Sequence, residues 1–196
     1  MKTKKIAKIP YKGIPFVSNL FRKRIEASTQ FASLNENSVI LDVGCKDGYL
    51  LKTIRNYNQS CKCYGIEKNP KVLEMIKTCD VRVADVTDLP FENNFFDKVF
   101  VLDVLEHVEE LDKAIEEIKR VLKTHGNVIL SGPTETWFYK LCRLFYRHMI
   151  DFEEHVHTVY GIEKKFQLKG FQLINQKSLP GFPIPELFRI SKFKKI

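Results

Sequence analysis

Long apolar segments are missing from this chain of 196 residues. No run approaches the ~18 consecutive apolar residues of a membrane-spanning helix, and the basic N-terminus lacks the apolar stretch of a signal peptide. The five cysteines are odd in number, and none of them has the spacing of a zinc site. We therefore expect a cytoplasmic protein with reduced thiols, and neither a membrane span nor a disulfide framework.

Acidic residues are missing from residues 1–24, which carry several lysines and arginines. The C-terminus, from Lys192 to Ile196, is basic as well, and the two ends supply much of the net charge of +8. Such a distribution favours an anionic partner. This partner would be a phosphate-bearing substrate, a surface of anionic lipid, or RNA. The alternative is that these charges only keep a small domain soluble.

The most informative segment that is present is a strand joined to a helix by a glycine-containing turn. Residues 39–43 predict a buried strand, Gly44 and Gly48 a turn, and residues 49–57 a helix. Unpaired helix N–H groups then lie beside the edge at which open α/β sheets bind ligands. The turn matches neither the dinucleotide fingerprint nor a Walker loop, so it predicts a cofactor site of another kind.

Acidic residues recur at the ends of the strands predicted to follow. Residues 63–67 predict a strand that ends in Glu67, roughly 20 residues beyond the glycine turn, where a carboxylate accepts hydrogen bonds from two ribose hydroxyls. A strand over residues 81–86 carries Asp85 near its end, and a strand over residues 98–102 is followed by Asp103. A solvated surface carboxylate is the alternative for Glu67. The series indicates a cofactor site along one edge of a parallel sheet.

The glycine turn resembles motif I of class I S-adenosylmethionine-dependent methyltransferases, an acidic residue followed by a glycine-rich turn. It reads Asp42-Val-Gly44-Cys-Lys46-Asp-Gly48, so Lys46 replaces the middle glycine of the fullest form. Further on, the order D-L-P-F, F-D, L-E-H-V, R-V-L-K and G is similar to that of the small-molecule and quinone-biosynthesis methyltransferases. The resemblance covers about residues 35–135.

This resemblance implies an α/β fold, a Rossmann-like three-layer sandwich with a mostly parallel seven-stranded sheet and helices on both faces. It also implies S-adenosylmethionine as the cofactor, with Asp85 receiving the adenine amino group and the backbone N–H of Val86 meeting the ring. The expected cofactor-binding residues lie in the turn and at the strand ends: Asp42, Gly44, Cys45, Gly48, Glu67, Asp85, Val86 and Asp103.

We expect a single domain in four parts. Residues 1–34 would form a basic extension and a lid helix, residues 35–135 the cofactor-binding core, residues 136–165 a substrate-specificity insertion, and residues 166–196 the C-terminal strands. Within the core, a helix from Leu111 is predicted to stop at Gly126, before a strand over residues 127–130. Strands at 170–176 and 187–194 would complete the sheet, the last one antiparallel.

The predicted insertion begins with a basic, aromatic-rich helix over residues 137–149. Its apolar side carries Trp137, Leu141, Leu144, Phe145 and Met149, and Lys140, Arg143 and Arg147 lie on another side. Such a helix is typical of proteins that lie on a membrane surface or receive a lipid-like substrate. We therefore expect a small-molecule or lipid-like methyl acceptor and a peripheral contact with anionic membrane. Packing of this helix against its own sheet is the alternative.

Three histidines are candidates for the general base, which is needed only if the acceptor loses a proton as it attacks. His107 lies just past the fourth predicted strand, and His155 and His157 alternate in an extended segment that would face the cleft. Glu153 could join the last two in a metal set. We favour substrate binding, proton transfer or structural hydrogen bonding for these residues and predict no metal site.

The sequence favours a methyltransferase that acts by in-line displacement at the sulfonium carbon. Two other functions stay open. An RNA methyltransferase would use the same cofactor site and basic ends, but the segment from Asp103 to Glu106 does not resemble the N-P-P-[YF] motif of base-amino methyltransferases. A non-catalytic S-adenosylmethionine-binding partner protein would also keep the acidic series. The sequence gives no indication of the oligomeric state.

Overall fold

The computed structural model describes residues 15–73, 76, 79–146, 154–180 and 185–196. Seven strands form one sheet in the order β3-β2-β1-β4-β5-β7-β6. Their bounds are β1 (Val39–Val43), β2 (Lys62–Glu67), β3 (Asp80–Val83), β4 (Phe96–Leu102), β5 (Leu122–Pro133), β6 (Phe171–Leu179) and β7 (Phe188–Lys195). The first five strands pair in parallel, and β7 is antiparallel to both β5 and β6. This confirms the mostly parallel seven-stranded sheet.

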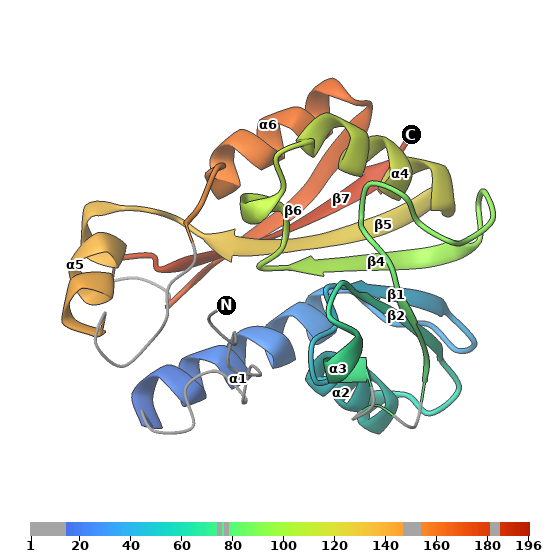
Figure 1. The fold of residues 1–196 in the computed structure, drawn as a ribbon, viewed down its shortest axis with the longest axis horizontal. Coiled ribbons are helices and arrows are strands. Elements are labelled where there is room, and N and C mark those ends of the chain that lie inside the picture. The colour runs from blue at the N-terminus through green and yellow to red at the C-terminus, as the bar shows by residue number, and fades with distance from the viewer. Residues whose placement is uncertain (1–14, 74–75, 77–78, 147–153, 181–184) are drawn as a thin grey trace.

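Helices cover both faces of the sheet (Figure 1). One layer holds α1 (Pro15–Phe31), α2 (Tyr49–Tyr57) and α3 (Pro70–Leu73), and the other holds α4 (Leu111–Val121) and α6 (Val159–Leu168). The short η1 (Leu105–His107) follows β4, and α5 (Trp137–Tyr146) follows β5 at the end toward which β4 and β5 point. The predicted three-layer sandwich is therefore confirmed, and the carboxyl ends of the parallel strands face α1 and α5.

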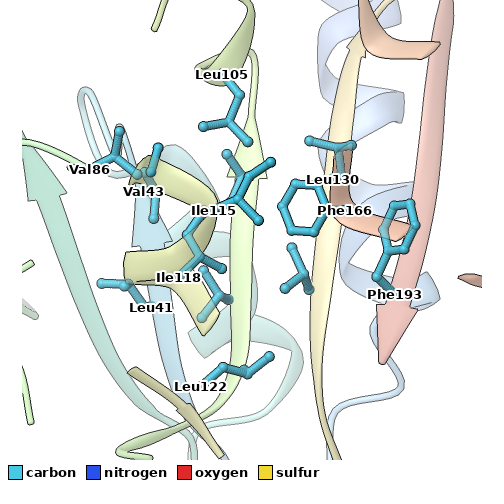
Figure 2. Packing of buried hydrophobic residues seen from close by; sticks show 14 of the residues in the cluster. Leu41, Val43, Val86, Leu105, Ile115, Ile118, Leu122, Leu130, Phe166 and Phe193 are labelled. Carbon is cyan, nitrogen blue, oxygen red and sulfur yellow. The ribbon is translucent and has the colours of Figure 1, made fainter. Parts of the chain in front are cut away.

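The larger hydrophobic core lies between the sheet and the layer of α4 and α6 (Figure 2). Ile115 and Ile118 of α4 are fully buried because apolar residues recur along one face of that helix. Phe166 of α6 stacks on Phe193 of β7 with ring centroids 5.2 Å apart. Each such side chain contributes about 1.5–3 kcal/mol through burial. This packing fixes the sheet edge that carries the site.

The smaller core holds α1 and α2 against the opposite face of the sheet. Ile25 of α1 and Leu51 and Ile54 of α2 are buried there with Ile40 of β1 and Phe100 of β4. The apolar face predicted for residues 49–57 is thus confirmed. Helix α1, the helix expected within residues 1–34, runs from Pro15 to Phe31. It is anchored over the ends of the strands by its C-terminal half.

The predicted helix stop at Gly126 is wrong. Helix α4 ends at Val121, and β5 begins at once with Leu122, which pairs with Phe96 of β4. The register of these two strands then shifts between Phe96 and Lys98, so Gly126 lies inside β5 at an irregularity rather than at a helix end. The end of α4 is therefore determined by the pairing of β5 with β4 and not by a local stop signal in the sequence.

Other boundaries differ by a few residues. Strand β3 ends at Val83, before the predicted end at residue 86, and Asp85 forms only an isolated bridge with Asp88. Strand β6 reaches Leu179, and β7 confirms the antiparallel seventh strand. The predicted helix over 137–149 runs to Tyr146, and Arg147, Met149 and Glu153 lie outside the described residues.

Among the helices that the structure describes, none combines the length and the apolar character that crossing a membrane requires.

Candidate functional site

The turn after β1 is built around two glycines in the left-handed region. Gly44 has φ 71° and Gly48, which caps α2, has φ 72°. The N–H groups of Gly44 and Cys45 both donate to the carbonyl of Ile66 at 2.9 Å, which ties the turn to β2. A Cβ on Gly44 would lie 2.5 Å from Cγ2 of Val104, so a side chain there has no room. The turn requires glycine at residue 44 for both reasons.

Lys46 stands where the fullest motif has its middle glycine, and it also has a positive φ of 46°. Its backbone N–H donates to Oε2 of Glu67 at 3.2 Å, and the N–H of Asn69 donates to Oε1 at 3.1 Å. The Glu67 carboxylate is therefore held at the end of β2 by the backbone of two loops. A carboxylate fixed in this way is preorganised for hydrogen-bond donors such as ribose hydroxyls.

A cavity opens above the carboxyl ends of β1 and β4, under the inner face of α1. Four of the predicted cofactor-binding residues line it, namely Asp42, Gly44, Cys45 and Asp103. The other lining residues come from α1, the turn, α2 and β4: Phe21, Arg24, Ile25, Lys46, Asp47, Tyr49, Leu50 and Leu102. Phe21 and Ile25 of α1 line the cavity at this end of the sheet, where the sequence analysis expects a lid helix.

Asp42 is only 3% exposed at the end of β1. Burial raises the pKa of its carboxyl well above the ordinary value, the charges of Glu67 and Asp47 raise it further, and the nearby Lys46 ammonium lowers it. Cys45 is also buried. Its sulfur lies so close to Gly65 that a Cβ on that glycine would be 2.8 Å from it. Burial likewise raises the pKa of this thiol, so Cys45 is a packed, unreactive residue whose backbone faces the cavity.

Arg24 of α1 lies in this cavity although it is only 1% exposed. Its guanidinium donates to both carboxylate oxygens of Asp103, with Nη1 to Oδ1 at 2.7 Å and Nη2 to Oδ2. The ring of Phe188 lies 4.4 Å from the guanidinium carbon, and that of Phe21 lies 5.2 Å away. Two aromatic faces and a bidentate ion pair thus hold a buried cation beside the glycine turn.

Asp85 follows β3, the strand next to β2 and its Glu67. Its Oδ1 accepts hydrogen bonds from the N–H and the hydroxyl of Thr87 at 2.9 Å each, and Lys68 pairs with Oδ2 at 2.5 Å. Burial raises the pKa of Asp85, but the contacts with Lys68 and Thr87 outweigh it, and the pKa is lowered on balance. Val86 is buried in the larger core. Glu67, Asp85 and Val86 do not line the cavity.

A second group of side chains lies beyond β4, around η1. The rings of His107 and His155 meet edge to face with centroids 4.9 Å apart. Nδ1 of His155 contacts Oε1 of Glu135 at 2.6 Å, and Nδ1 of His107 contacts the carbonyl of Glu154 at 3.0 Å. The structure therefore joins His155 to the carboxylate of Glu135, which the sequence analysis did not combine with it, and joins His107 to a backbone carbonyl.

Glu106 lies beside these histidines and is 2% exposed. Its backbone carbonyl accepts the N–H groups of Val156 at 2.7 Å and His157 at 3.2 Å, which ties this segment to η1. Its side-chain Oε1 has no hydrogen-bond partner among the described residues. Burial, and then the charge of Asp103, raise the pKa of Glu106 to about 8, although Arg24 and Lys46 act in the opposite direction.

His157 is directed elsewhere. Its Nε2 donates to the carbonyl of Val108 at 3.1 Å, which is a structural contact with the loop after η1. In the structure the ring of His155 thus contacts that of His107, whereas His157 bonds to the backbone carbonyl of Val108.

Sequence reasoning missed Arg24, Glu106 and Glu135. A signal for Arg24 was present, since it lies between Phe21 and Ile25 on the apolar face of the lid helix, where a cation is unusual. Glu135 and His155 are 20 residues apart in the sequence, on either side of α5. No local pattern identifies that pairing.

Residues 41–130 match the family described as methyltransferase domain. The tRNA (carboxymethyluridine(34)-5-O)-methyltransferase of Arabidopsis thaliana is 34% identical over 121 residues, which are 59% of this chain and 29% of that protein. The sterol 4-C-methyltransferase strm-1 of Caenorhabditis elegans is 29% identical over 140 residues, which are 66% of this chain and 39% of the relative. The chain thus spans well under half of these two relatives.

The N-methyltransferase NodS from Bradyrhizobium japonicum, solved with S-adenosyl-L-homocysteine, shares the fold with a TM-score of 0.73 at 15% identity, over 97% of this chain and 94% of that one. The domain match over residues 41–130, the fold and the acidic strand ends together make the chain similar to the class I S-adenosylmethionine-dependent methyltransferases. S-adenosylmethionine is the cofactor that this similarity implies. The backbone cradle at Gly44 and the carboxylate of Glu67 fit that group.

Proposed function

We propose that this chain transfers the methyl group of S-adenosylmethionine to a lipid-like acceptor, and that α5 receives the acceptor at the membrane surface. The exposed apolar side of α5 carries the proposal. Trp137 is 70% exposed, Leu141 41%, Leu144 55% and Phe145 75%. Packing of this side against the sheet, the alternative in the sequence analysis, does not account for such exposure. Contiguous exposed apolar surface of this kind marks an interaction site.

The inner side of α5 connects this surface to the candidate acceptor residues. Tyr139 is only 9% exposed, and its ring lies 6.0 Å from that of Phe188 and 6.5 Å from that of His155. Phe188 in turn covers Arg24 in the cofactor cavity. A molecule held on α5 is thus adjacent to both the histidine pair and the cofactor cavity. Residues 136–165 would accordingly form the acceptor-binding insertion.

At the cofactor end, each polar group has a distinct task. Glu67 would accept the ribose hydroxyls and Asp85 the adenine amino group. Arg24 and Asp103 supply opposite charges where the amino-acid end, with its carboxylate and ammonium groups, would lie. The bound cofactor supplies an electrophilic methyl group on a sulfonium. Asp42 and Gly44 shape the floor of the cavity, and the lid helix excludes water from it.

At the acceptor end, the chain must hold the attacking atom in line with the methyl group and accept a proton when that atom carries one. His155 is oriented by Glu135 through Nδ1, which leaves Nε2 as the proton-accepting atom. His107 lies against the same ring. These two histidines, rather than His157, are the proton acceptors that we propose.

Vesicle co-sedimentation tests the acceptor surface. Vesicles of phosphatidylcholine with and without phosphatidylglycerol are mixed with the parent chain and with Trp137→Ser/Phe145→Ser. Each aromatic side chain that leaves water contributes roughly 2 kcal/mol, so the double variant should lose binding by a factor of 100 or more. Cationic side chains near an anionic surface add about 1 kcal/mol each, so binding should weaken with salt.

A matched control changes equally exposed apolar residues elsewhere, since Tyr57 and Leu168 are 61% and 73% exposed. Tyr57→Ser/Leu168→Ser should bind vesicles as the parent does. Transfer of labelled methyl groups to lipid extracts then identifies the acceptor. If neither vesicle type pellets the parent chain at low salt, the membrane proposal is wrong and a soluble small molecule becomes the better acceptor.

An RNA acceptor is the second candidate, because a relative is named as a tRNA methyltransferase and the chain has a net charge of +8. Filter binding with tRNA in the same salt series distinguishes the two. RNA binding that survives Trp137→Ser/Phe145→Ser, together with methyl transfer to tRNA, would favour this candidate over the lipid-like one.

A further inference from the structure

We propose that Glu106, His107 and His155 bind a divalent transition-metal ion of the Zn²⁺ type. Each of the three residues brings one ligand atom to within 4.8 Å of the other two. Ligand atoms about 2.0–2.1 Å from a tetrahedral Zn²⁺ lie about 3.4 Å from one another. Modest rotation of the three side chains would bring their ligand atoms to these distances. Two imidazoles and one carboxylate form the ligand set typical of catalytic zinc, which keeps a further position open.

The carboxylate of Glu106 gives an independent reason. The residue is 2% exposed, and its Oε1 has no hydrogen-bond partner among the described residues. A buried carboxylate oxygen without a partner is costly, and coordination to a cation is one of the few arrangements that satisfy it. The short η1 places Glu106 next to His107, so two of the ligands come from one turn of backbone.

Hydrogen bonds outside the cluster orient both imidazoles as metal ligands. The carbonyl of Glu154 can only accept, so Nδ1 of His107 carries the proton and Nε2 has the lone pair. The carboxylate of Glu135 contacts Nδ1 of His155 at 2.6 Å and sets the same tautomer there. A carboxylate behind a histidine ligand is the arrangement that commonly raises the basicity of metal-bound imidazole.

This set differs from the combination of His155, His157 and Glu153 that the sequence analysis considered and set aside. His157 is directed to the carbonyl of Val108, and Glu153 lies outside the described residues. The cluster is assembled from two segments that are distant in sequence, joined where the N–H of Val156 donates to the carbonyl of Glu106.

The role of the ion rests on the proposed function and limits the acceptor to a molecule that bears a hydroxyl group. With the ion bound, His107 and His155 serve as its ligands and no longer accept the proton themselves. Coordination lowers the pKa of a hydroxyl, whose proton leaves to solvent. An electron pair of the acceptor oxygen then forms the bond to the methyl carbon, and the carbon–sulfur bond breaks with its electron pair staying on sulfur. The products are a methyl ether and S-adenosylhomocysteine, and the charge balances.

Metal binding is measured without any acceptor, so its outcome is separate from that of the proposed function. The metal-free chain is titrated with Zn²⁺ and with Mg²⁺ by calorimetry, and Co²⁺ absorption reports the coordination geometry. Imidazole ligands favour Zn²⁺ and Co²⁺ over Mg²⁺. We expect one Zn²⁺ per chain, no such site for Mg²⁺, and loss of the Zn²⁺ site in Glu106→Gln and His155→Ala.

Two further variants separate ligand roles from general effects. Glu135→Gln keeps all three ligands and should weaken Zn²⁺ binding by roughly 10–100-fold. His125→Ala removes an exposed histidine outside the cluster and should bind Zn²⁺ as the parent does. Calorimetry with S-adenosylhomocysteine checks that each variant is folded and retains the cofactor site.

The proposal is overturned if the parent chain takes up no Zn²⁺, or if Glu106→Gln and His155→Ala bind it as tightly as His125→Ala does. Either result leaves cofactor binding and methyl transfer untouched as separate conclusions. Conversely, a chain that binds Zn²⁺ at this site but methylates no lipid would refute the proposed acceptor and keep the metal site.

Discussion

Arg24 of the lid helix forms a bidentate ion pair with Asp103 at the end of β4. The arginine side chain is 2% exposed and the aspartate 21%, so this pair links α1 to the sheet through nearly dry surroundings. Buried pairs often add little net stability, whereas the loss of one partner is costly. We propose that the pair is retained for the charges that it would offer to the cofactor rather than for stability.

That explanation gives the first prediction. Arg24→Met leaves Asp103 without its partner and should destabilise the chain by about 3 kcal/mol, at the low end for buried pairs because the aspartate is partly exposed. Arg24→Met/Asp103→Leu should recover much of that stability but still bind S-adenosylhomocysteine poorly. Urea unfolding and calorimetry measure the two quantities. Normal cofactor affinity in the double variant would make the pair purely structural.

The second prediction concerns Glu67. Its carboxylate accepts the N–H groups of Lys46 and Asn69, and we expect it to accept the ribose hydroxyls as well. Glu67→Gln keeps the shape and removes the charge, so affinity for S-adenosylhomocysteine should fall by about 1.5–3 kcal/mol, roughly 10–150-fold. Asp80→Asn, at the opposite end of the neighbouring β3, is the control. Equal affinities of both variants in calorimetry would remove Glu67 from the site.

The third prediction concerns Gly44, whose Cβ position lies 2.5 Å from Cγ2 of Val104. Gly44→Val should abolish cofactor binding while circular dichroism stays native, since the strain is local. Gly44→Ala adds about 1–2 kcal/mol of left-handed backbone strain and also forces Val104 to move. Gly44→Ala/Val104→Ala should therefore recover part of the lost stability. Gly161→Ala, where the nearest atom is 3.5 Å away, is the control. A Gly44→Val chain that binds normally would show that the turn is not the site.

The sequence predicted the strand ends that carry the glycine turn and Glu67 because the pattern there is local. Gly44 follows β1, Gly48 caps α2 and Glu67 ends β2, and parallel pairing brings the ends of the two strands to one edge without any knowledge of side-chain packing. The same reasoning identified the apolar face of α2 and the antiparallel β7. Short-range patterns and one topological rule were sufficient for these features.

The pairing of His107 with His155 was harder to predict because these contacts are long-range. His107 and His155 meet only after the chain has crossed β5 and α5 and returned, and no spacing in the sequence records that meeting. The helix stop at Gly126 was mispredicted for a related reason, since Leu122 leaves the helix to pair with Phe96. Where tertiary pairing outweighs a local signal, the sequence alone misleads.

The last prediction follows from the buried carboxyl of Asp42, whose pKa is raised chiefly by burial. Above its unfolded-state pKa of about 4, the native chain holds more protons at this residue than the unfolded chain does. Unfolding free energy should therefore fall as the pH rises from about 4, and Asp42→Asn should remove this dependence. The variant should be more stable than the parent at pH 7, with a difference that narrows toward pH 4, although it binds the cofactor less tightly.

Asp97 provides a control of opposite sign. Burial raises its pKa, but Lys123 and the N–H of Val39 outweigh that effect and lower the pKa on balance. Its contribution to stability is therefore present at neutral pH and lost as the pH falls below about 4, through the lowered native pKa. Asp97→Asn should be less stable than the parent at pH 7 and should approach it in acid. Urea midpoints between pH 3 and pH 8 measure both variants. Parallel curves for Asp42→Asn and the parent would mean that the Asp42 carboxyl has the same pKa in the folded and unfolded chain, and its burial would then have no electrostatic cost that cofactor binding must offset.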